Sequence, residues 1–390
     1  MTVRRIAAVW AAAVFGAGVL YSRTSGHLHN AQFWAEDGAV FFKDAFITDG
    51  TTIALPFAGY LHFMPRFTAE AASLFPSASA PAIYVWAAFA VSVWAVLVVA
   101  ASRLPGAPFL AAVMLMVPHT GEVLATITNV QWICAAALTA VACSPSPSGR
   151  LNRANQVVFT FAASLSGPFS VFIGPVAVAR AWRFRDPFSI LIASIICGAA
   201  ALQFYMVLHH YAAFEGEKHA LHLALTLIDR VFGTLTHGWR SETPGELMLV
   251  AAVIAILFLL LSIKEIRWYW WCFAFVFAAS LASTWTKFAP GMSMHFDWPS
   301  MDDRYFFVPR LLVVWSFAMA LVVASMFWRA ISALCLGVCL LAGLYTHDHD
   351  WWNKRPLEPM SWRAEAMRLD QGQSVSIPIN PPPYTVTIQR

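Results

Sequence analysis

Charge is scarce in this sequence of 390 residues: Asp, Glu, Lys and Arg make up 12% of it, against about 25% in an ordinary soluble protein. Hydrophobic residues make up 59%, and the mean hydropathy is +0.62. A water-soluble surface needs more charge than this, so the composition excludes a soluble globular protein, a disordered chain and a coiled coil. We therefore predict an all-α protein that crosses a membrane many times.

Motifs for common cofactors are missing as well. The sequence has no Gly-rich nucleotide-binding pattern, no CxxC pair and no internal repeat, and its six cysteines lie within or beside apolar segments. The net charge of +4 comes from basic residues placed singly at the ends of apolar runs, which indicates topology and not nucleic-acid binding. Four histidines between His209 and His222 resemble a metal cluster only loosely. We predict no cofactor and no nucleic-acid partner, and no residues are assigned as metal ligands, although a divalent ion stays open as an alternative.

Apolar runs that approach the thickness of a bilayer recur along the chain. Windows of about 20 residues identify about eleven of them. Two short runs flank Ser166-Gly167-Pro168, and this pair is expected to form a tilted or re-entrant hairpin. The expected spans are 6–22, 83–101, 107–118, 129–143, 155–166, 169–180, 188–208, 246–263, 268–285, 309–328 and 330–346.

The distribution of Lys and Arg orients the chain. Placing Arg4 and Arg5 in the cytoplasm leaves only two acids on the inner side, Asp186 and Glu265, with the other acids and all twelve histidines outside. The first apolar run resembles a signal peptide, but no cleavage site stands out after it, so we predict that it is the first span. Any chemistry is therefore expected outside the cytoplasm.

Two parts of the chain are expected. Residues 1–346 form the transmembrane domain, with a first outer loop at about 23–82, and residues 347–390 form a small outer tail. Within the tail, the amphipathic stretch 362–369 predicts a helix and the alternation at 374–379 predicts a short strand, both packed on the outer face.

An acidic pair, Glu36-Asp37, follows the first span. Aromatic residues on both sides of it, including Trp34, favour a place in the membrane interface, where burial can turn a carboxylate into a general base. Acids among aromatic residues at a membrane face are costly unless they are used. A solvated acidic turn, with Trp34 as a plain interface anchor, is the alternative.

His62 and Arg66 stand four residues apart in the same loop, and Pro65 opens an amphipathic helix. Arginine suits bidentate contact with phosphate, and the start of a helix favours an anion. We predict that His62 and Arg66 bind a lipid-linked phosphate. An interfacial helix whose arginine meets any lipid headgroup is the alternative.

A polar approach precedes the tenth span. Arg304 and Tyr305 enter the membrane together and are predicted to hold a phosphate oxygen, with Lys287 as a supporting cation. An ordinary surface ion pair between Arg304 and Asp302 or Asp303 is the alternative.

Asn129, Gln131 and Trp132 mark the outer end of the fourth span. Amide groups and an aromatic face suit sugar hydroxyls and ring stacking, so these residues are predicted to bind a sugar or an acceptor, together with Trp34 and His295. Hydrogen bonding between helices explains the two amides equally well.

These motifs together resemble the multi-span glycosyltransferases of the C-type fold (GT-C), which use polyprenyl-phosphate-linked sugars. The resemblance rests on the acids Glu36-Asp37 in the first outer loop and on Asp303-Arg304-Tyr305 at the start of a late helix, as in bacterial enzymes that modify O-antigen or other envelope glycans. It implies a GT-C-like fold in the bacterial inner membrane, with the active site in the periplasm. The tail is shorter than the carbohydrate-binding domain that some members carry.

The resemblance also implies an activity. A sugar passes from a polyprenyl-phosphate donor to a hydroxyl of an envelope glycan or glycolipid, with inversion, and membrane lipids surround the enzyme. Asp37 is the expected general base, with Glu36 orienting it or taking its place. Arg66, Arg304 and Lys287 are expected to stabilise the leaving phosphate.

Three alternatives stay open. A flippase or exporter of lipid-linked sugars needs a polar path through the membrane, and charges in the middle of the spans are nearly absent. An O-antigen ligase or polymerase is expected to place its key residues in large late loops, whereas the acidic pair here is early. A membrane scaffold without activity would tolerate substitution of Glu36 and Asp37.

Overall fold

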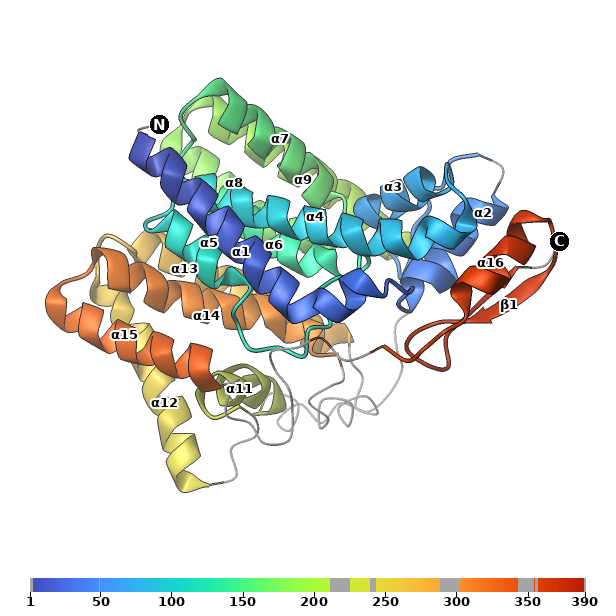
Figure 1. The fold of residues 1–390 in the computed structure, drawn as a ribbon. Coiled ribbons are helices and arrows are strands. Elements are labelled where there is room, and N and C mark those ends of the chain that lie inside the picture. Colours follow the sequence, from blue (N-terminus) through green and yellow to red (C-terminus); the bar gives the residue numbers. More distant parts are fainter. Residues whose placement is uncertain are drawn as a thin grey trace.

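The chain folds mostly into helices (Figure 1), in a computed structural model that describes residues 3–48, 50–210, 225–238, 243–287, 302–342, 354 and 357–388. The helices are α1 (Val3–His29), α2 (Lys43–Ile47), α3 (Phe63–Ala72), α4 (Ala80–Ala101), α5 (Ala107–Met114), α6 (Val130–Cys143), α7 (Arg150–Ser164), α8 (Phe169–Phe184), α9 (Pro187–His210), α11 (Thr234–Thr236), α12 (Pro244–Leu259), α13 (Arg267–Lys287), α14 (Arg304–Val323), α15 (Met326–Leu341) and α16 (Trp362–Asp370). Shorter helical turns are η1 (Asp37–Phe42), η2 (Ser77–Ser79), η3 (Asp229–Gly233) and η4 (Leu260–Ser262), and the strands are β1 (Val375–Pro378) and β2 (Thr385–Ile388).

Each predicted apolar segment coincides with a helix: α1, α4 to α9, and α12 to α15. Among the described residues, five helices are long and apolar enough to cross a membrane, namely α1, α4 together with η2, α9, α12 together with η4, and α14. Helices α6 and α15 are also apolar but have only 14 and 16 residues. This set of helices indicates a membrane location.

The predicted span 107–118 forms a helix over only part of its length. Helix α5 has 8 residues, or about 12 Å, against roughly 30 Å of bilayer core. After it the chain continues as mostly buried, irregular backbone whose carbonyls need partners away from water. Arg23 of α1 provides them, because its guanidinium donates to the carbonyls of Leu115, Val117 and His119 at 2.6, 3.3 and 3.0 Å.

Helices α6 and α14 form the centre of the bundle. Every residue of α6 is buried, and so is α14 from Tyr305 to Ala320, whereas α12 buries only Val250 and Val253. A helix that is apolar on all sides has no preferred face, so its neighbours decide which residues are covered. The exposed apolar sides of outer helices such as α12 suit contact with lipid.

The tail packs against the first outer loop, at the end of the bundle opposite the N-terminus (Figure 1). Strands β1 and β2 pair antiparallel, with Val375 opposite Ile388. Trp362 of α16 lies edge-on against Phe33 and Phe42, with ring centroids 4.6 and 5.2 Å apart. The predicted helix and strand are confirmed, and β2 is an addition that the sequence did not predict.

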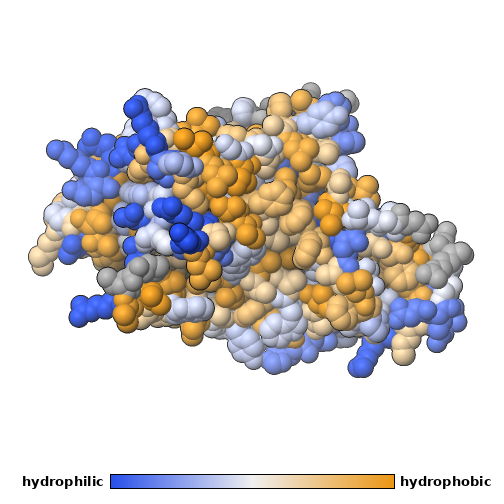
Figure 2. Space-filling view, turned by 90° about the horizontal axis from the view of Figure 1, so that it is seen from above, coloured by the Kyte–Doolittle hydropathy of each residue, from blue (hydrophilic) through white to orange (hydrophobic). Residues whose placement is uncertain are grey.

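Hydrophobic side chains form a broad band across the molecule, and hydrophilic ones gather toward its two ends (Figure 2). Hydrogen bonds join the turns at the end that carries the N-terminus. Arg5 donates to the Ser102 carbonyl at 2.8 Å, Arg103 donates to the Ser146 carbonyl at 3.3 Å, and the Ser146 hydroxyl donates to Asp186 at 2.6 Å. The basic turns predicted to share one side of the membrane therefore lie together.

Candidate functional site

Asp37 is buried where the first outer loop meets the bundle. Its backbone N–H donates to the Trp34 carbonyl at 2.9 Å, and this turn starts η1. The side chain is 3% exposed. Its Oδ1 accepts both the N–H and the hydroxyl of Thr128, at 2.9 and 2.5 Å. Among the described residues nothing donates to Oδ2, so this oxygen is the one left to take a proton from a ligand.

Burial sets the protonation of Asp37. It raises the pKa of this carboxyl from 3.8 to about 7, against the opposing effects of the Thr128 hydrogen bonds and the charge of Lys354, and Glu36 adds to the rise. A general base works best when its pKa lies near the working pH. Asp37 is therefore suited to accept a proton at neutral pH.

Lys354, a cation from the tail, is buried close to Asp37. It is 4% exposed. Its Nζ donates to the Leu124 carbonyl at 2.5 Å and to the Thr126 hydroxyl, and it lies 4.8 Å from the centroid of the Trp34 ring. Two elements, the irregular segment after α5 and the loop after α1, thus hold this ammonium group.

Burial lowers the pKa of Lys354 from 10.5 to about 7, while the carboxylates of Asp37 and Glu122 oppose that fall. Gly121 makes the close approach possible, because a Cβ built on it would lie 2.6 Å from the Cα of Lys354, and its φ of +76° disfavours other residues. Asp37 and Lys354 thus form a buried acid and base that support each other's charge.

Arg304 forms a second charged group at the same end of the bundle. Its guanidinium pairs with Glu122, and with Asp302 at 2.8 Å, and its backbone N–H donates to Glu122 at 3.2 Å. Burial raises the pKa of Glu122 although Arg304 opposes the rise. The Glu122 carbonyl accepts a hydrogen bond from the Asn129 side chain at 3.1 Å. Asn129 directly follows Thr128 in the chain. The two charged groups are therefore neighbours.

Glu36 acts electrostatically on this second group. Its side chain is half-buried. Burial raises the pKa of Tyr384 in the tail, and the charge of Glu36 raises it further. The Glu36 carboxylate also interacts electrostatically with Arg304. The two adjacent acids thus have different surroundings, and Asp37 is the one buried beside a lysine.

A cavity of about 330 Å³ lies among α6, α8, α9, α13 and α14. Tyr305 lines it, next to Arg304 in sequence, and the Tyr305 ring meets Trp132 edge-on with centroids 4.9 Å apart. Most of the wall is apolar, as an occupant with a hydrocarbon part requires. The lining residues are Tyr60, Gln131, Trp132, Pro168, Phe169, Val171, Phe172, Phe204, Val207, Ser280, Ser283, Thr284 and Tyr305.

Three buried polar atoms on this wall have no hydrogen-bond partner among the described residues: Gln131 Oε1, Trp132 Nε1 and Ser280 Oγ. Buried polar groups are nearly always hydrogen-bonded, so such atoms mark a place for a ligand or for water. Gln131 uses its other end, Nε2, on the Thr128 carbonyl at 3.1 Å. The cavity is thereby connected to the residue that holds Asp37, and its open donors and acceptors suit a hydroxyl-rich ligand.

His62 and Arg66 take other positions in the loop. Arg66 is 1% exposed, pairs with Asp44 at 2.8 Å and donates to the Leu55 carbonyl at 3.2 Å. The His62 ring stacks on Tyr60, with centroids 4.5 Å apart. Arg66 therefore has an internal carboxylate partner, and its contact with a lipid phosphate stays a prediction.

Asp303 is not the partner of Arg304. It is buried and accepts from Arg230 and Arg310 at 2.9 and 2.8 Å. Burial alone would raise the pKa of Asp303, but the guanidinium groups of Arg310 and Arg230 outweigh it and hold the pKa below its usual value. Of the two acids considered from the sequence, Asp302 pairs with Arg304, and Asp303 joins η3 to α14.

The side chains of two residues predicted for the site are not described by the structure. His295 lies outside the described residues, as does the side chain of Lys287 at the end of α13. Lys354 and Thr128 were not among the residues predicted for the site. The available signals were a lysine just after the Trp-Trp pair of the tail, and a hydroxyl one position before Asn129.

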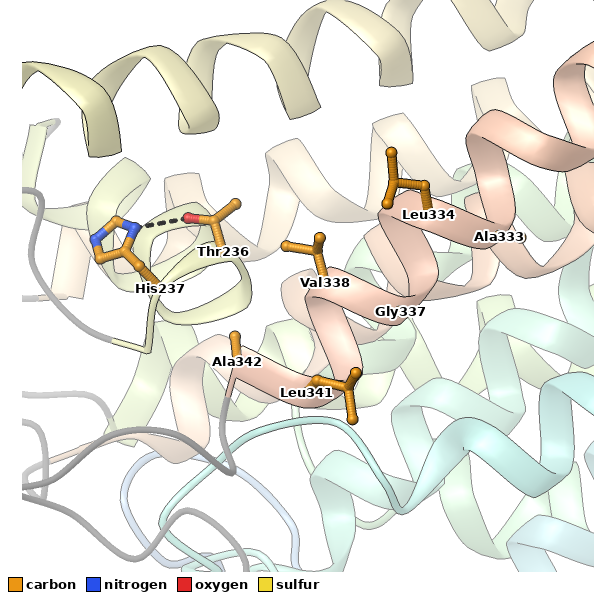
Figure 3. A pocket seen from close by; sticks show the side chains of 8 residues that line it. All are labelled: Thr236, His237, Ala333, Leu334, Gly337, Val338, Leu341 and Ala342. Atoms are coloured by element: carbon orange, nitrogen blue, oxygen red, sulfur yellow. Dashed lines mark hydrogen bonds between the residues drawn. The ribbon is translucent and has the colours of Figure 1, made fainter.

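A larger cavity, of about 430 Å³, lies between α11 and α15 (Figure 3). Its walls are apolar except for Thr236 and His237, whose side chains are joined at 2.9 Å. The residues predicted for the site are not among those labelled along it. Within the described part of the chain, no group of three His, Cys, Asp or Glu side chains lies close enough to hold a metal ion.

No protein family, no curated protein and no solved structure matches this chain.

Proposed function

We propose that this protein is a GT-C-type glycosyltransferase of the bacterial inner membrane, with about eleven spans and a periplasmic active site. It moves a sugar from a polyprenyl-phosphate donor to a hydroxyl of an envelope glycan or glycolipid. The observation that carries the proposal is the buried Asp37 carboxyl, with a pKa near 7 and an open Oδ2, beside Lys354 and the Arg304 group.

Asp37 is the general base of this proposal. Its Oδ2 takes the proton of the acceptor hydroxyl while the hydroxyl oxygen attacks the anomeric carbon of the donor. The bond between that carbon and the phosphate oxygen breaks, and its electron pair leaves with polyprenyl phosphate. Thr128 fixes the carboxylate through Oδ1, so only Oδ2 faces the reaction.

Arg304 is the cation proposed for the donor phosphate. Glu122 and Asp302 hold its guanidinium in place, and an arginine held in this way still has donors for a phosphate oxygen. The raised pKa of Glu122 reduces the negative charge that an incoming phosphate meets. Lys354 acts on Asp37 instead, because its charge favours the ionised carboxylate.

The cavity beside Tyr305 is proposed to take the rest of the donor. Its aromatic and aliphatic wall suits the first part of a polyprenyl chain. Gln131 Oε1 and Trp132 Nε1 offer an acceptor and a donor for sugar hydroxyls. A sugar bound there would satisfy atoms that the protein leaves without partners.

The test uses the full chain in nanodiscs with a panel of short polyprenyl-phosphate sugars and a set of glycan acceptors. The proposal expects release of polyprenyl phosphate that depends on the acceptor. If the donor is moved across a liposome membrane and is not consumed, the transferase proposal is wrong and the flippase alternative takes its place.

A further inference from the structure

A third cavity lies at the other end of the bundle, away from the site described above. It measures about 360 Å³ and lies between the end of α8 and the turn that joins α12 to α13. Arg5, near the start of α1, lies at this end too, where it donates to the Ser102 carbonyl. The lining residues of the cavity are Arg183, Phe184, Lys264, Glu265, Arg267, Trp268, Tyr269 and Trp271.

Three cations meet in this cavity against one carboxylate, that of Glu265. Within the described residues, none of Arg183, Lys264 and Arg267 forms an ion pair, and Glu265 forms none either. Arg267 donates from its Nε to the Leu261 carbonyl at 2.9 Å, and this closes the turn. Within the described part of the chain, the terminal nitrogens of Arg267 and those of the other two cations donate to no carboxylate and can meet an anion.

Aromatic rings hold Arg183 in place. The Arg183 guanidinium lies 4.9 Å from the centroid of the Trp268 ring and 5.8 Å from that of Phe184. Trp268 is itself anchored, because its Nε1 donates to the Cys143 carbonyl at the end of α6 at 2.9 Å. The wall of the cavity is therefore part of the bundle, and not a loose surface.

Exposed tryptophans beside this cavity indicate that it lies at the level of the lipid headgroups. Trp182 is 74% exposed and Trp271 is 58% exposed, and tryptophan collects at the level of lipid headgroups. The exposed apolar surface continues along the adjacent helices, through Phe258, Leu259 and Phe275. A ligand here would place an anionic group among the cations and a hydrocarbon part against that surface.

We propose that this cavity binds the phosphate headgroup of an anionic phospholipid. Basic pockets between helices at a membrane surface take such headgroups, and each cation adds to the attraction. The proposal does not depend on the glycosyltransferase activity. A phosphate group is the shared chemistry of a lipid and a free phosphate ion, and the apolar surface favours the lipid.

The experiment uses the full chain, purified in a neutral detergent. Binding is followed by native mass spectrometry and by the shift in thermal unfolding as phosphatidylglycerol, phosphatidylcholine or inorganic phosphate is added. The site variant is Arg183→Gln, Lys264→Gln and Arg267→Gln combined. The matched control, Arg103→Gln, Arg150→Gln and Arg329→Gln combined, removes the same charge from the same end of the bundle.

The proposal expects phosphatidylglycerol to bind and stabilise the protein more than phosphatidylcholine does, with affinity reduced roughly tenfold or more in the site variant and kept in the control. Equal losses of affinity in both variants would mean that the lipid is attracted by the overall positive charge of this end, and would overturn the proposal. Equal binding of both lipids would overturn it too. Binding of inorganic phosphate as tight as that of phosphatidylglycerol would assign the cavity to a soluble anion.

Discussion

Asp37 and Thr128 lie 91 positions apart in the chain and meet through two hydrogen bonds to a single carboxylate oxygen. The contact ties the first outer loop to the start of α6. It also decides which oxygen of Asp37 is left for chemistry, and so it links the fold directly to the proposed base.

Replacing Thr128 by Val removes the hydroxyl donor and keeps the backbone donor. The hydroxyl favours the charged carboxylate, so its loss should raise the pKa of Asp37 further. We expect the acid limb of the pH profile of transfer, near pH 7 in the native protein, to move up by about one pH unit. Thr128→Ser keeps the hydroxyl and should leave the limb in place. An unmoved limb in Thr128→Val would argue against Asp37 as the titrating base.

Lys354→Gln tests the buried cation. Transfer needs ionised Asp37, so activity should rise as the pH rises through about 7, the pKa of that carboxyl. Lys354 lowers this pKa, and its removal should shift the limb to higher pH and cost about tenfold in activity at pH 7. Arg363→Gln removes an exposed tail cation and serves as the control. A shift to lower pH would contradict the role given to Lys354.

Arg304 can be tested with two substitutions. Arg304→Gln removes the charge, and we expect kcat/KM for the donor to fall by about 10- to 100-fold, as for loss of a charge-assisted hydrogen bond. Arg304→Lys keeps the charge but loses the forked geometry of the guanidinium, so its kcat/KM should lie between those of the native protein and Arg304→Gln. Steady-state kinetics with varied donor measure both. Unchanged donor kinetics in Arg304→Gln would remove this residue from the site.

Much of the fold was predictable, because long apolar runs read directly as helices. The run at 107–118 is helical only in its first part, since hydropathy does not report that α5 stops after 8 residues and that Arg23 satisfies the irregular backbone beyond it. Glu36-Asp37 and Arg304-Tyr305 could be found because charged residues are scarce in this chain and these lie beside aromatic residues next to apolar runs. Lys354 and Thr128 could not, since single residues gain their meaning only from contacts across the fold.

Asp303→Asn tests stability and not catalysis. The change removes the buried carboxylate that both Arg230 and Arg310 contact, and breaking a buried ion pair costs about 3–5 kcal/mol. The pKa of Asp303 is held low, so its contribution is present above the ordinary Asp pKa and is lost as the pH falls below it. Thermal unfolding in detergent measures the loss. Asp302→Asn changes a more exposed pair and should cost far less; equal losses would contradict the account.

The most direct test compares Asp37→Asn with Glu36→Gln and the native protein in nanodiscs, with release of polyprenyl phosphate as the readout and donor binding as the control for folding. Asn keeps the shape of the side chain but cannot take up the proton. We predict that Asp37→Asn binds donor and loses about 100- to 10,000-fold in kcat, while Glu36→Gln loses much less. Full transfer by Asp37→Asn, with or without loss in Glu36→Gln, would contradict the proposal that Asp37 is the general base.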